Sequence, residues 1–546
     1  GLNRVGLNPP FGHYVMESFD GVVYTFNNEN YISTIAYPGG ITLTFTYNPI
    51  LKTLTSVTNN LGRTLSFTYG SVSLLSYLQS VSDGSGYSTT YTVNPATSWK
   101  LTEFRDKAAQ LTKYTYDSKR RMEQYELPNN TIVANTFDSR DRVTMQSNLK
   151  GDVTRFYYSG DSTFAERGTR RILTKFNADG QPLEVWDGVE VTRYTYDGLG
   201  RQIRVDYPEF NRVETDYDGV NRVTQIRTFP KGAGATLYES FTYSHATWNK
   251  WATHTNPRGI TTSRTYDGYG RLITQTGPAV SGGTPVETWT YNAYGQLASH
   301  TDATGVSTHY YYFQSELTSM VVDEGGLNLT TSYSHDAVGN KVTVTNPRGK
   351  TTTYTYDVLR RVLSETSPSP FSYVVSRTYD QVGNELTTSR PIGFNTQTTT
   401  RTFSNTSKLT QVIDPLGKYT WNTYDVYDRL TSTLDAEFRN TQFDYDSSNR
   451  LVKVTDANNV IAEQRTYTAN GLLATQKDGN NNQTTYVYDG YDRKKQVVYP
   501  DASYEEWTYD NNGNILTFRS RSGDAITYTY DNLDRVLTRT PADQPT

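Results

Sequence analysis

The chain of 546 residues carries 52 basic and 56 acidic side chains and has no cysteine. A charge so close to balance gives no argument for a nucleic-acid partner, an anionic membrane surface or an acidic substrate. The missing cysteine excludes a disulfide framework, thiolate metal sites and a cysteine nucleophile. Since no run of about 18 apolar residues occurs, the sequence indicates no transmembrane helix.

Tyrosine is unusually abundant, with 45 residues, while the apolar fraction as a whole is low. Low hydrophobicity is typical of disordered chains, but those chains are poor in aromatic and β-branched residues. Tyr, Thr and Val suit a pleated, half-buried surface. The composition therefore predicts a β-sheet protein with little deep core.

In chain order we expect three parts. Residues 1–25 form an N-terminal lead-in, residues 26–540 form one continuous repeat region, and residues 541–546 read as a truncated end. The repeat shows most clearly as the pair Tyr-Asp, whose step settles at 21 residues from Asp489 to Asp510 to Asp531. Self-similarity at a period of roughly 20–50 residues predicts a stacked array, here of about 24 units once degenerate copies are included.

Each unit reads as a β-hairpin. In Tyr354–Asp357 the Tyr and Thr residues alternate, which is a strand pattern, and Val362 opens a second strand after a short turn. The third residue after the Tyr-Asp pair is repeatedly Gly, Asn or Asp, the residues that best tolerate positive φ. The next residue is often Arg, which invites a bidentate pair with the Asp, either within the hairpin or with its neighbour.

We predict that these repeat positions are structural. The residues concerned are Tyr116, Asp117, Tyr196, Asp197, Gly200, Arg201, Tyr217, Asp218, Arg222, Tyr266, Asp267, Gly270, Arg271, Tyr356, Asp357, Arg361, Tyr379, Asp380, Tyr424, Asp425, Arg429, Tyr445, Asp446, Arg450, Tyr488, Asp489, Arg493, Tyr509, Asp510, Tyr530, Asp531 and Arg535.

A second kind of turn lies between the Tyr-Asp turns, for example at Asn256–Gly259, Asn346–Gly349 and Asp414–Gly417. We call these the far turns. Strand, turn, strand, far turn predicts an all-β fold, a long antiparallel ribbon of hairpins. Because twist accumulates in a large sheet, we expect the ribbon to spiral into a hollow shell or barrel, with successive turns paired edge to edge.

The motif Y-D-x-x-G-R at steps of about 21, with D-P-x-G or N-P-R-G turns between, resembles the YD-repeat or Rhs (rearrangement hotspot) family. The resemblance implies a β-strand cocoon around a C-terminal polypeptide. It extends to polymorphic toxin shells, insecticidal toxin complex B and C components, and teneurins. The family's cores also end in a D-P-x-G block with an aspartyl autoprotease. Asp414 matches only its opening before another repeat begins at Tyr424, so we interpret Asp414 as an ordinary turn.

No catalytic, metal or cofactor motif stands out. We expect His335 to be a stacked ring in a Tyr position and residues 478–483 to be a hairpin turn with no bound calcium. A packed insertion is favoured over a pocket around His245, His254, Trp248 and Trp251.

Two functions remain. The first is a bacterial toxin shell segment, secreted or at the cell surface, that encapsulates a C-terminal toxin or passenger and contacts further shell or secretion apparatus. It would need no cofactor, no nucleic acid, no membrane insertion and no catalysis. The alternative is a teneurin-like or wall-associated adhesin that binds glycans or proteins through exposed aromatics.

Overall fold

The protein is a single β-sheet. The computed structural model describes residues 2–8, 13–18, 22–37, 40–72, 75–95, 99–148, 150–245, 249–393 and 395–542. These residues form fifty strands and no α-helix. They therefore contain no helix that could cross a membrane. The predicted all-β ribbon is confirmed.

The first half of the ribbon contains the strands β1 (Leu2–Asn8), β2 (His13–Ser18), β3 (Val23–Phe26), β4 (Ile32–Ala36), β5 (Thr42–Tyr47), β6 (Leu54–Asn59), β7 (Thr64–Val72), β8 (Leu75–Ser82), β9 (Ser88–Asn94), β10 (Lys100–Arg105), β11 (Leu111–Tyr116), β12 (Met122–Glu126), β13 (Ile132–Phe137), β14 (Val143–Ser147), β15 (Val153–Ser159), β16 (Ser162–Arg167), β17 (Arg170–Phe176), β18 (Pro182–Trp186), β19 (Val191–Tyr196), β20 (Gln202–Asp206), β21 (Arg212–Tyr217), β22 (Val223–Phe229), β23 (Leu237–Tyr243), β24 (Trp251–Thr255), β25 (Thr261–Tyr266) and β26 (Leu272–Thr276).

The second half contains β27 (Val286–Tyr291), β28 (Leu297–Thr301), β29 (Ser307–Phe313), β30 (Glu316–Val322), β31 (Leu329–His335), β32 (Lys341–Thr345), β33 (Thr351–Tyr356), β34 (Val362–Thr366), β35 (Val374–Tyr379), β36 (Glu385–Ile392), β37 (Asn395–Phe403), β38 (Leu409–Ile413), β39 (Tyr419–Tyr424), β40 (Leu430–Leu434), β41 (Asn440–Tyr445), β42 (Leu451–Thr455), β43 (Ile461–Tyr467), β44 (Leu473–Asp478), β45 (Gln483–Tyr488), β46 (Lys494–Val498), β47 (Tyr504–Tyr509), β48 (Ile515–Arg519), β49 (Ala525–Tyr530) and β50 (Val536–Pro541).

The alternating pattern forms the hairpins as predicted. In β33, Tyr354 and Tyr356 are half-buried on one face, while Thr353 and Thr355 are exposed on the other. Across the pair, the Thr355 hydroxyl lies 2.7 Å from the hydroxyl of Ser364 in β34. The register shifts between Thr355 and Tyr356, where the strand enters the Tyr-Asp turn. Such a bulge beside a short turn adds twist to the ribbon.

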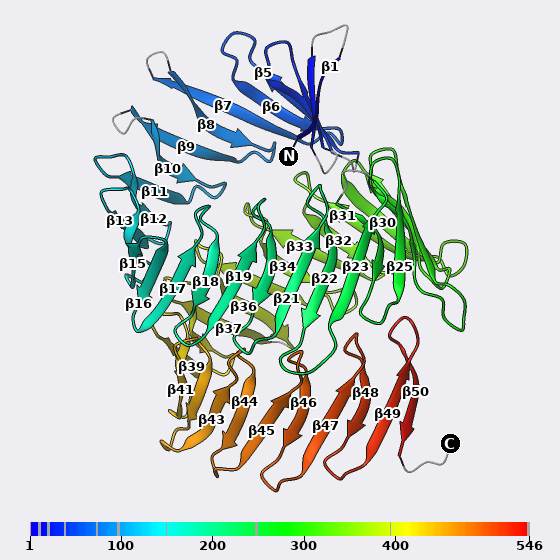
Figure 1. Cartoon of the computed structure of the whole chain (residues 1–546). Coiled ribbons are helices and arrows are strands. Elements are labelled where there is room, and N and C mark those ends of the chain that lie inside the picture. Colours follow the sequence, from blue (N-terminus) through cyan, green and yellow to red (C-terminus); the bar gives the residue numbers. More distant parts are fainter. Residues whose placement is uncertain are drawn as a thin grey trace.

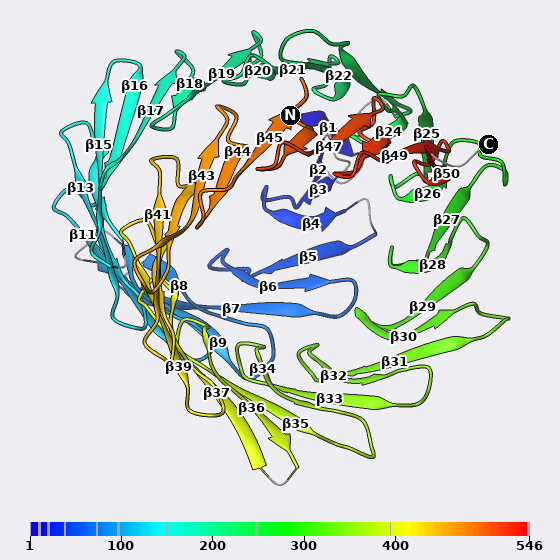
Figure 2. The same cartoon turned by 90° about the horizontal axis from the view of Figure 1, so that it is seen from below.

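The ribbon winds into two coils. The first coil (β1–β26) starts at the top of Figure 1, and the second coil (β27–β50) ends at the bottom. In Figure 2, strands β11 to β35 trace a ring, and both ends of the ribbon lie within its outline. Strands pair only with their neighbours in the chain, and each pairing is antiparallel, so the sheet does not close on itself. β1 and β2 belong to this same series of pairings.

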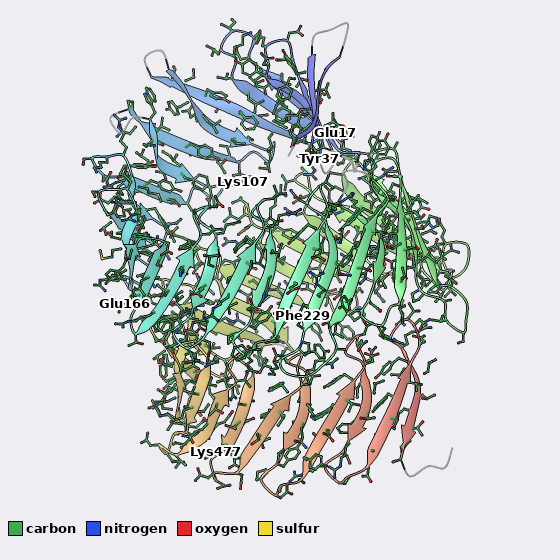
Figure 3. The ribbon with its side chains drawn as sticks, viewed as in Figure 1. Glu17, Tyr37, Lys107, Glu166, Phe229 and Lys477 are labelled. Carbon is green, nitrogen blue, oxygen red and sulfur yellow. The ribbon has the colours of Figure 1, made fainter. Side chains whose placement is uncertain are left out.

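Both faces of the sheet are wetted. The accessible surface is 30882 Å², whereas a compact globule of 61.7 kDa would expose about 20,000 Å². No side chain among the described residues is fully buried. Figure 3 shows side chains standing off the ribbon along its length. Such exposure is expected of a ribbon coiled around an open interior and not of a packed body.

The expectation that successive coils pair edge to edge is wrong. The strands run across the ribbon, so its long margins are made of turns. Among the described residues, unpaired strand edges occur only at β1 and β50. One margin carries the Tyr-Asp turns and the other carries the far turns. Where the coils meet, far turns of the first coil contact Tyr-Asp turns of the second, at chain separations of 252 to 281 residues. We call this contact line the seam.

Candidate functional site

The Tyr-Asp turn is organised by its aspartate. In the turn after β19, Oδ1 of Asp197 accepts hydrogen bonds from the amides of Leu199 (2.9 Å) and Arg201 (3.0 Å). Its Oδ2 accepts one from Nε of Arg201 at 2.6 Å. Gly200 has φ of 77°, which closes the turn in the left-handed region. The carboxylate therefore holds the turn backbone and the following arginine together.

The arginine then reaches the next hairpin. Nη1 of Arg201 donates to the carbonyl of Asp218 at 2.8 Å, and its guanidinium lies 4.9 Å from the ring centre of Tyr217. In return, the Tyr217 hydroxyl donates to the carbonyl of Gln202 at 3.0 Å. This hairpin thus holds its successor by a forward arginine contact and a backward tyrosine contact.

This clasp recurs along the chain. The Asp–Arg distances lie between 2.6 and 2.7 Å for the pairs 117/121, 197/201, 218/222, 267/271, 357/361, 425/429, 446/450, 489/493 and 531/535. The hydroxyl groups donate to a carbonyl of an earlier strand at Tyr116, Tyr217, Tyr266, Tyr356, Tyr379, Tyr424, Tyr445, Tyr488, Tyr509 and Tyr530. Tyr196 occupies the same place at the end of β19.

The turn prediction is also correct at the third residue. Positive φ is found at Gly200, Asn221, Gly270, Gly295, Gly339, Gly383, Asp428, Asn449, Gly471, Asp492, Gly513 and Asp534. We call this the left-handed position.

Where the arginine is absent, the fourth residue still complements the aspartate. Asn384 donates to Oδ2 of Asp380 at 2.7 Å, and Asn514 donates to Oδ2 of Asp510 at 2.8 Å. In the degenerate unit at Asn292, the side-chain Nδ2 of Asn292 donates to Oε1 of Gln296 at 2.8 Å. In these units a matched side-chain donor and acceptor therefore occupies the two positions.

These contacts favour the charged carboxylate. At Asp117 the side-chain hydrogen bond from Arg121 lowers the pKa below its ordinary value. At Asp267 burial opposes ionisation, but hydrogen bonds from the Arg271 backbone and side chain outweigh it, so the pKa is again lowered. At the end of β41, burial raises the pKa of Tyr445. Asp117 and Asp267 therefore stay ionised and Tyr445 stays protonated at neutral pH.

Replacing Tyr445 with Phe is expected to weaken the clasp between two hairpins by about 1 kcal/mol, the usual net value of one hydrogen bond. The substitution removes the 2.9 Å bond to the Leu430 carbonyl and keeps the ring beneath Arg429. Hydrogen exchange of the β40–β41 amides would report the change. Tyr196 offers a matched control, because Tyr196→Phe removes a hydroxyl for which the structure gives no carbonyl acceptor. Equal loss at both positions would contradict the assignment.

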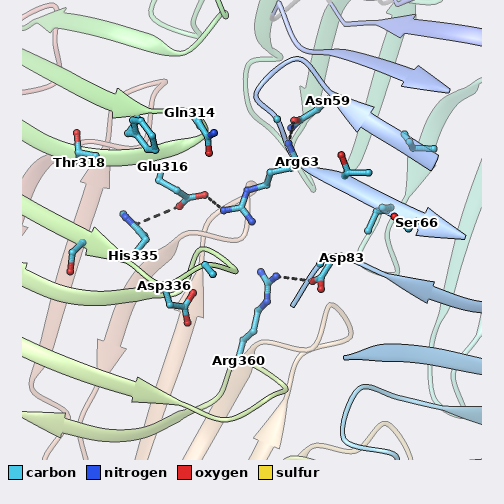
Figure 4. A pocket seen from close by; sticks show the side chains of 18 of the residues that line it. Asn59, Arg63, Ser66, Asp83, Gln314, Glu316, Thr318, His335, Asp336 and Arg360 are labelled. Atoms are coloured by element: carbon cyan, nitrogen blue, oxygen red, sulfur yellow. Dashed lines mark hydrogen bonds and ion pairs between the residues drawn. The ribbon is translucent and has the colours of Figure 1, made fainter. Parts of the chain in front are cut away.

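Sequence reasoning missed the seam. Arg63, in a far turn of the first coil, contacts Glu316 and Ser315 and donates to the Val338 carbonyl of the second coil. Nearby, Arg360 pairs with Asp83 at 3.2 Å. Arg63, Asp83, Glu316 and Arg360 line a cavity of about 1070 Å³ between the coils (Figure 4). Lys107 also binds Asp83. Figure 3 labels Lys107 just below the uppermost, blue strands.

A second cluster of charged and amide side chains lies further along the seam. Lys231 of the first coil contacts Glu209 and lies 2.9 Å from Oδ1 of Asp492. Asn470 donates to Oδ2 of Asp492 at 2.7 Å and to Oδ1 of Asn211 at 2.7 Å. Side chains and turn amides, instead of strand ladders, thus join the two coils. No local sequence signal marks these pairs, because their partners lie about half the chain apart.

The histidines act as side-chain partners of glutamates. His254 lies 3.1 Å from Glu239 and stacks on Phe241, and His300 lies 3.0 Å from Glu287. His335 fills a Tyr position, but its near neighbour is Glu316 at 3.6 Å instead of a stacked ring. Trp248 lies outside the described residues.

Two further loops are hairpin turns as interpreted. The Asp414 carbonyl accepts from Gly417 at 3.0 Å, and that of Asp478 accepts from Asn481 at 3.0 Å. Within the described ranges, His, Asp and Glu form no group that could hold a metal ion.

Comparison with protein-family models places these hairpins in a class. The RHS Repeat model matches residues 335–370 and 509–546, and the Teneurin YD-shell model matches residues 392–520. The resemblance to the YD-repeat or Rhs family is therefore confirmed over residues 335–370 and 392–546. No curated protein sequence matches the chain.

Solved structures of Tc toxin proteins have a similar fold. A TcdB2-TccC3 crystal structure matches with a TM-score of 0.61 at 13% identity, covering 93% of this chain and 34% of that one. The TcdB2-TccC3 structure without its hypervariable C-terminal region gives 0.58 at 13% identity, covering 97% and 34%. The Photorhabdus luminescens Tc holotoxin pore gives 0.54 at 12% identity, covering 98% and 32%. The chain spans about a third of these proteins, and at such identities the likeness shows the fold.

Proposed function

We propose that this chain is a shell segment of a bacterial Rhs/YD-repeat toxin, and that it encloses a C-terminal toxin or other passenger polypeptide before delivery. The observation that carries the proposal is the coiled ribbon itself, whose 30882 Å² of accessible surface leaves both faces wetted. Such a wall can hold a polypeptide apart from solvent proteases without any catalytic residue, and we assign none. Secretion or display at the cell surface goes with this role.

The fold comparison supports the same role. The chain shares its fold with TcdB2-TccC3, one structure of which lacks a hypervariable C-terminal region, and with a Tc holotoxin. Those proteins are about three times longer, so further shell would complete the wall around the passenger.

Protease protection tests the proposal. The full-length natural protein is expressed with whatever polypeptide its gene encodes after Thr546, and is treated with trypsin. We expect the following polypeptide to survive digestion while the same polypeptide expressed alone is degraded within minutes. Digestion at equal rates would overturn the shell role. Equal rates together with specific retention on a glycan array would favour the adhesin alternative, for which the Teneurin YD-shell match at residues 392–520 gives support.

A further inference from the structure

Three Tyr-Asp turns, and the equivalent turn after Phe137-Asp138, carry an aspartate at the left-handed position, although Gly adopts this conformation more easily. They are Asp141, Asp428, Asp492 and Asp534, with φ between 59° and 65°. Asp141 lies in the first coil, and the other three lie in the second coil on the seam. The extra carboxylate therefore needs a reason beyond turn formation.

At Asp141 the reason is the repeat arginine one unit earlier. Nη1 of Arg121 donates to Oδ1 of Asp141 at 2.7 Å and to the Asp138 carbonyl at 3.1 Å, while Nε binds Asp117 at 2.7 Å. One arginine thus bridges its own aspartate to the next turn. Arg201 and Arg429 make the same reach to Asn221 and Asn449.

The three seam aspartates have no such arginine. One repeat earlier, the position that Arg121 occupies relative to Asp141 is held by another residue. It is Lys408 for Asp428, Leu472 for Asp492 and Asn514 for Asp534. A cation from a far turn of the first coil stands there instead. The partners are Lys150 on Asp428 at 2.6 Å, Lys231 on Asp492 at 2.9 Å and Arg258 on Asp534 at 2.6 Å.

Arg258 reproduces the contacts of the missing arginine. Its Nη1 donates to the Asp531 carbonyl at 3.0 Å as well as to Asp534, and its Nε lies 3.4 Å from Oδ2 of Asp510. Lys150 likewise donates to the Asp425 carbonyl at 3.4 Å. The neighbouring coil therefore supplies a cation where other repeats supply an arginine from within. From the preceding repeat, only neutral side chains among the described residues reach these aspartates, with Thr406 on Asp428 at 2.8 Å, Asn470 on Asp492 at 2.7 Å and Asn514 on Asp534 at 2.6 Å.

We infer that this replacement, in which a cation of the first coil takes the place of the internal arginine, sets the register of one coil on the next. A cation in a far turn selects a Tyr-Asp turn that has an aspartate at its left-handed position and lacks the arginine one repeat earlier. The three positions lie along the seam and fix it at three points. The rule rests on the fold and stands whether or not the shell carries a passenger.

The chain contains its own control. The tetrapeptide of the far turn at Asn256–Gly259 recurs at Asn346–Gly349. Arg258 is half-buried in the seam, whereas Arg348 is exposed on the outer margin of the second coil. Among the described residues the structure gives the Arg348 guanidinium no partner. The same turn is therefore present once with a carboxylate acceptor and once without.

The decisive test restores the repeat. Asn514→Arg brings back the internal arginine, which competes with Arg258 for the Asp531 carbonyl and for Asp534. Because the protein has no cysteine, spin labels can be attached at Ser281→Cys in the first coil and Thr538→Cys in the second. Double electron–electron resonance then measures the distance between the two labels, and so between the coils. We expect a shift to longer, broader distances in Asn514→Arg and Arg258→Gln, and none in Arg348→Gln.

Two further measurements separate register from folding. Hydrogen exchange of the β49–β50 amides should stay slow in Asn514→Arg, since a charged bridge between Asp510 and Asp534 replaces the neutral bridge that Asn514 makes. The triple variant Lys408→Arg, Leu472→Arg, Asn514→Arg should lengthen the distances along the whole seam. An unchanged distance in Asn514→Arg, or an equal shift in Arg348→Gln, would overturn the rule. Protease protection by the native shell is unaffected by that outcome, so the two proposals fail separately.

Discussion

Replacing Asp267 with Ala is expected to cost about 2–4 kcal/mol of local stability, because partly buried donors lose a charged acceptor. Oδ1 of Asp267 accepts from the amides of Tyr269 and Arg271, both at 2.9 Å, and Oδ2 accepts from Nε of Arg271 at 2.6 Å. Arg271 in turn covers the ring of Tyr291 in the next hairpin. Both the turn and its clasp should therefore open. Native-state hydrogen exchange of β25 and β26 measures this local opening.

The neighbouring unit supplies the rescue. There the uncharged side chain of Asn292 accepts, at Oδ1, hydrogen bonds from the backbone amides of Tyr294 at 2.9 Å and Gln296 at 3.0 Å. The double variant Asp267→Asn, Arg271→Gln recreates that pair and should recover most of the loss, whereas Asp267→Asn alone leaves Arg271 without its carboxylate. If the double variant is as damaged as Asp267→Ala, complementarity of the two positions does not organise the turn.

Acid is expected to loosen the whole ribbon in a narrow pH range. The pKa values of Asp138, Asp197, Asp218, Asp267 and Asp531 all lie below the ordinary value, because hydrogen bonds to the charged form outweigh burial. The unfolded chain binds protons more readily, so stability rises with pH across this range. The stabilisation is complete above about pH 4 and is lost as the pH falls through the lower, folded values.

The five turns anchored by these aspartates titrate together, so the transition should be steep. Circular dichroism against pH, combined with measured proton uptake on unfolding, tests this. The variant Asp267→Asn, Arg271→Gln is the control, since its turn carries no titrating anchor, and its β25–β26 amides should stay protected at a lower pH than those of the other turns. Loss of structure that begins well above pH 5 would contradict the prediction.

The seam responds to acid in the same direction. Burial opposes ionisation of Asp428 and Asp534, but hydrogen bonds from Lys150 and Thr406 at Asp428, and from Asn514 and Arg258 at Asp534, lower both pKa values. Separation of the coils and melting of the hairpins are therefore expected in overlapping pH ranges. Spin labels across the seam, read beside circular dichroism, would order the two events.

The hairpin and its turn could be predicted from particular residues. Alternating Tyr and Thr in Tyr354–Tyr356 gave the strand, Asp357 gave the turn, and Gly200 or Asn449 marked where positive φ is needed. Each of these signals acts within a few residues of the chain, where side-chain period and backbone sterics decide the conformation. The sequence left open whether each Arg pairs within its own hairpin or with the neighbouring one. The structure shows that the arginine contacts both.

The seam could not be predicted in this way. Arg258 and Arg348 sit in identical tetrapeptides, yet one binds Asp534 and the other is exposed. Which far turn meets which Tyr-Asp turn depends on the radius of the coil, and that radius sums small twists over some two dozen strands. The sequence by itself therefore determined a wetted, antiparallel ribbon of hairpins. Only the tertiary structure decided how far it winds and which of its turns meet, because contacts between residues 252 to 281 apart leave no periodic trace in the chain.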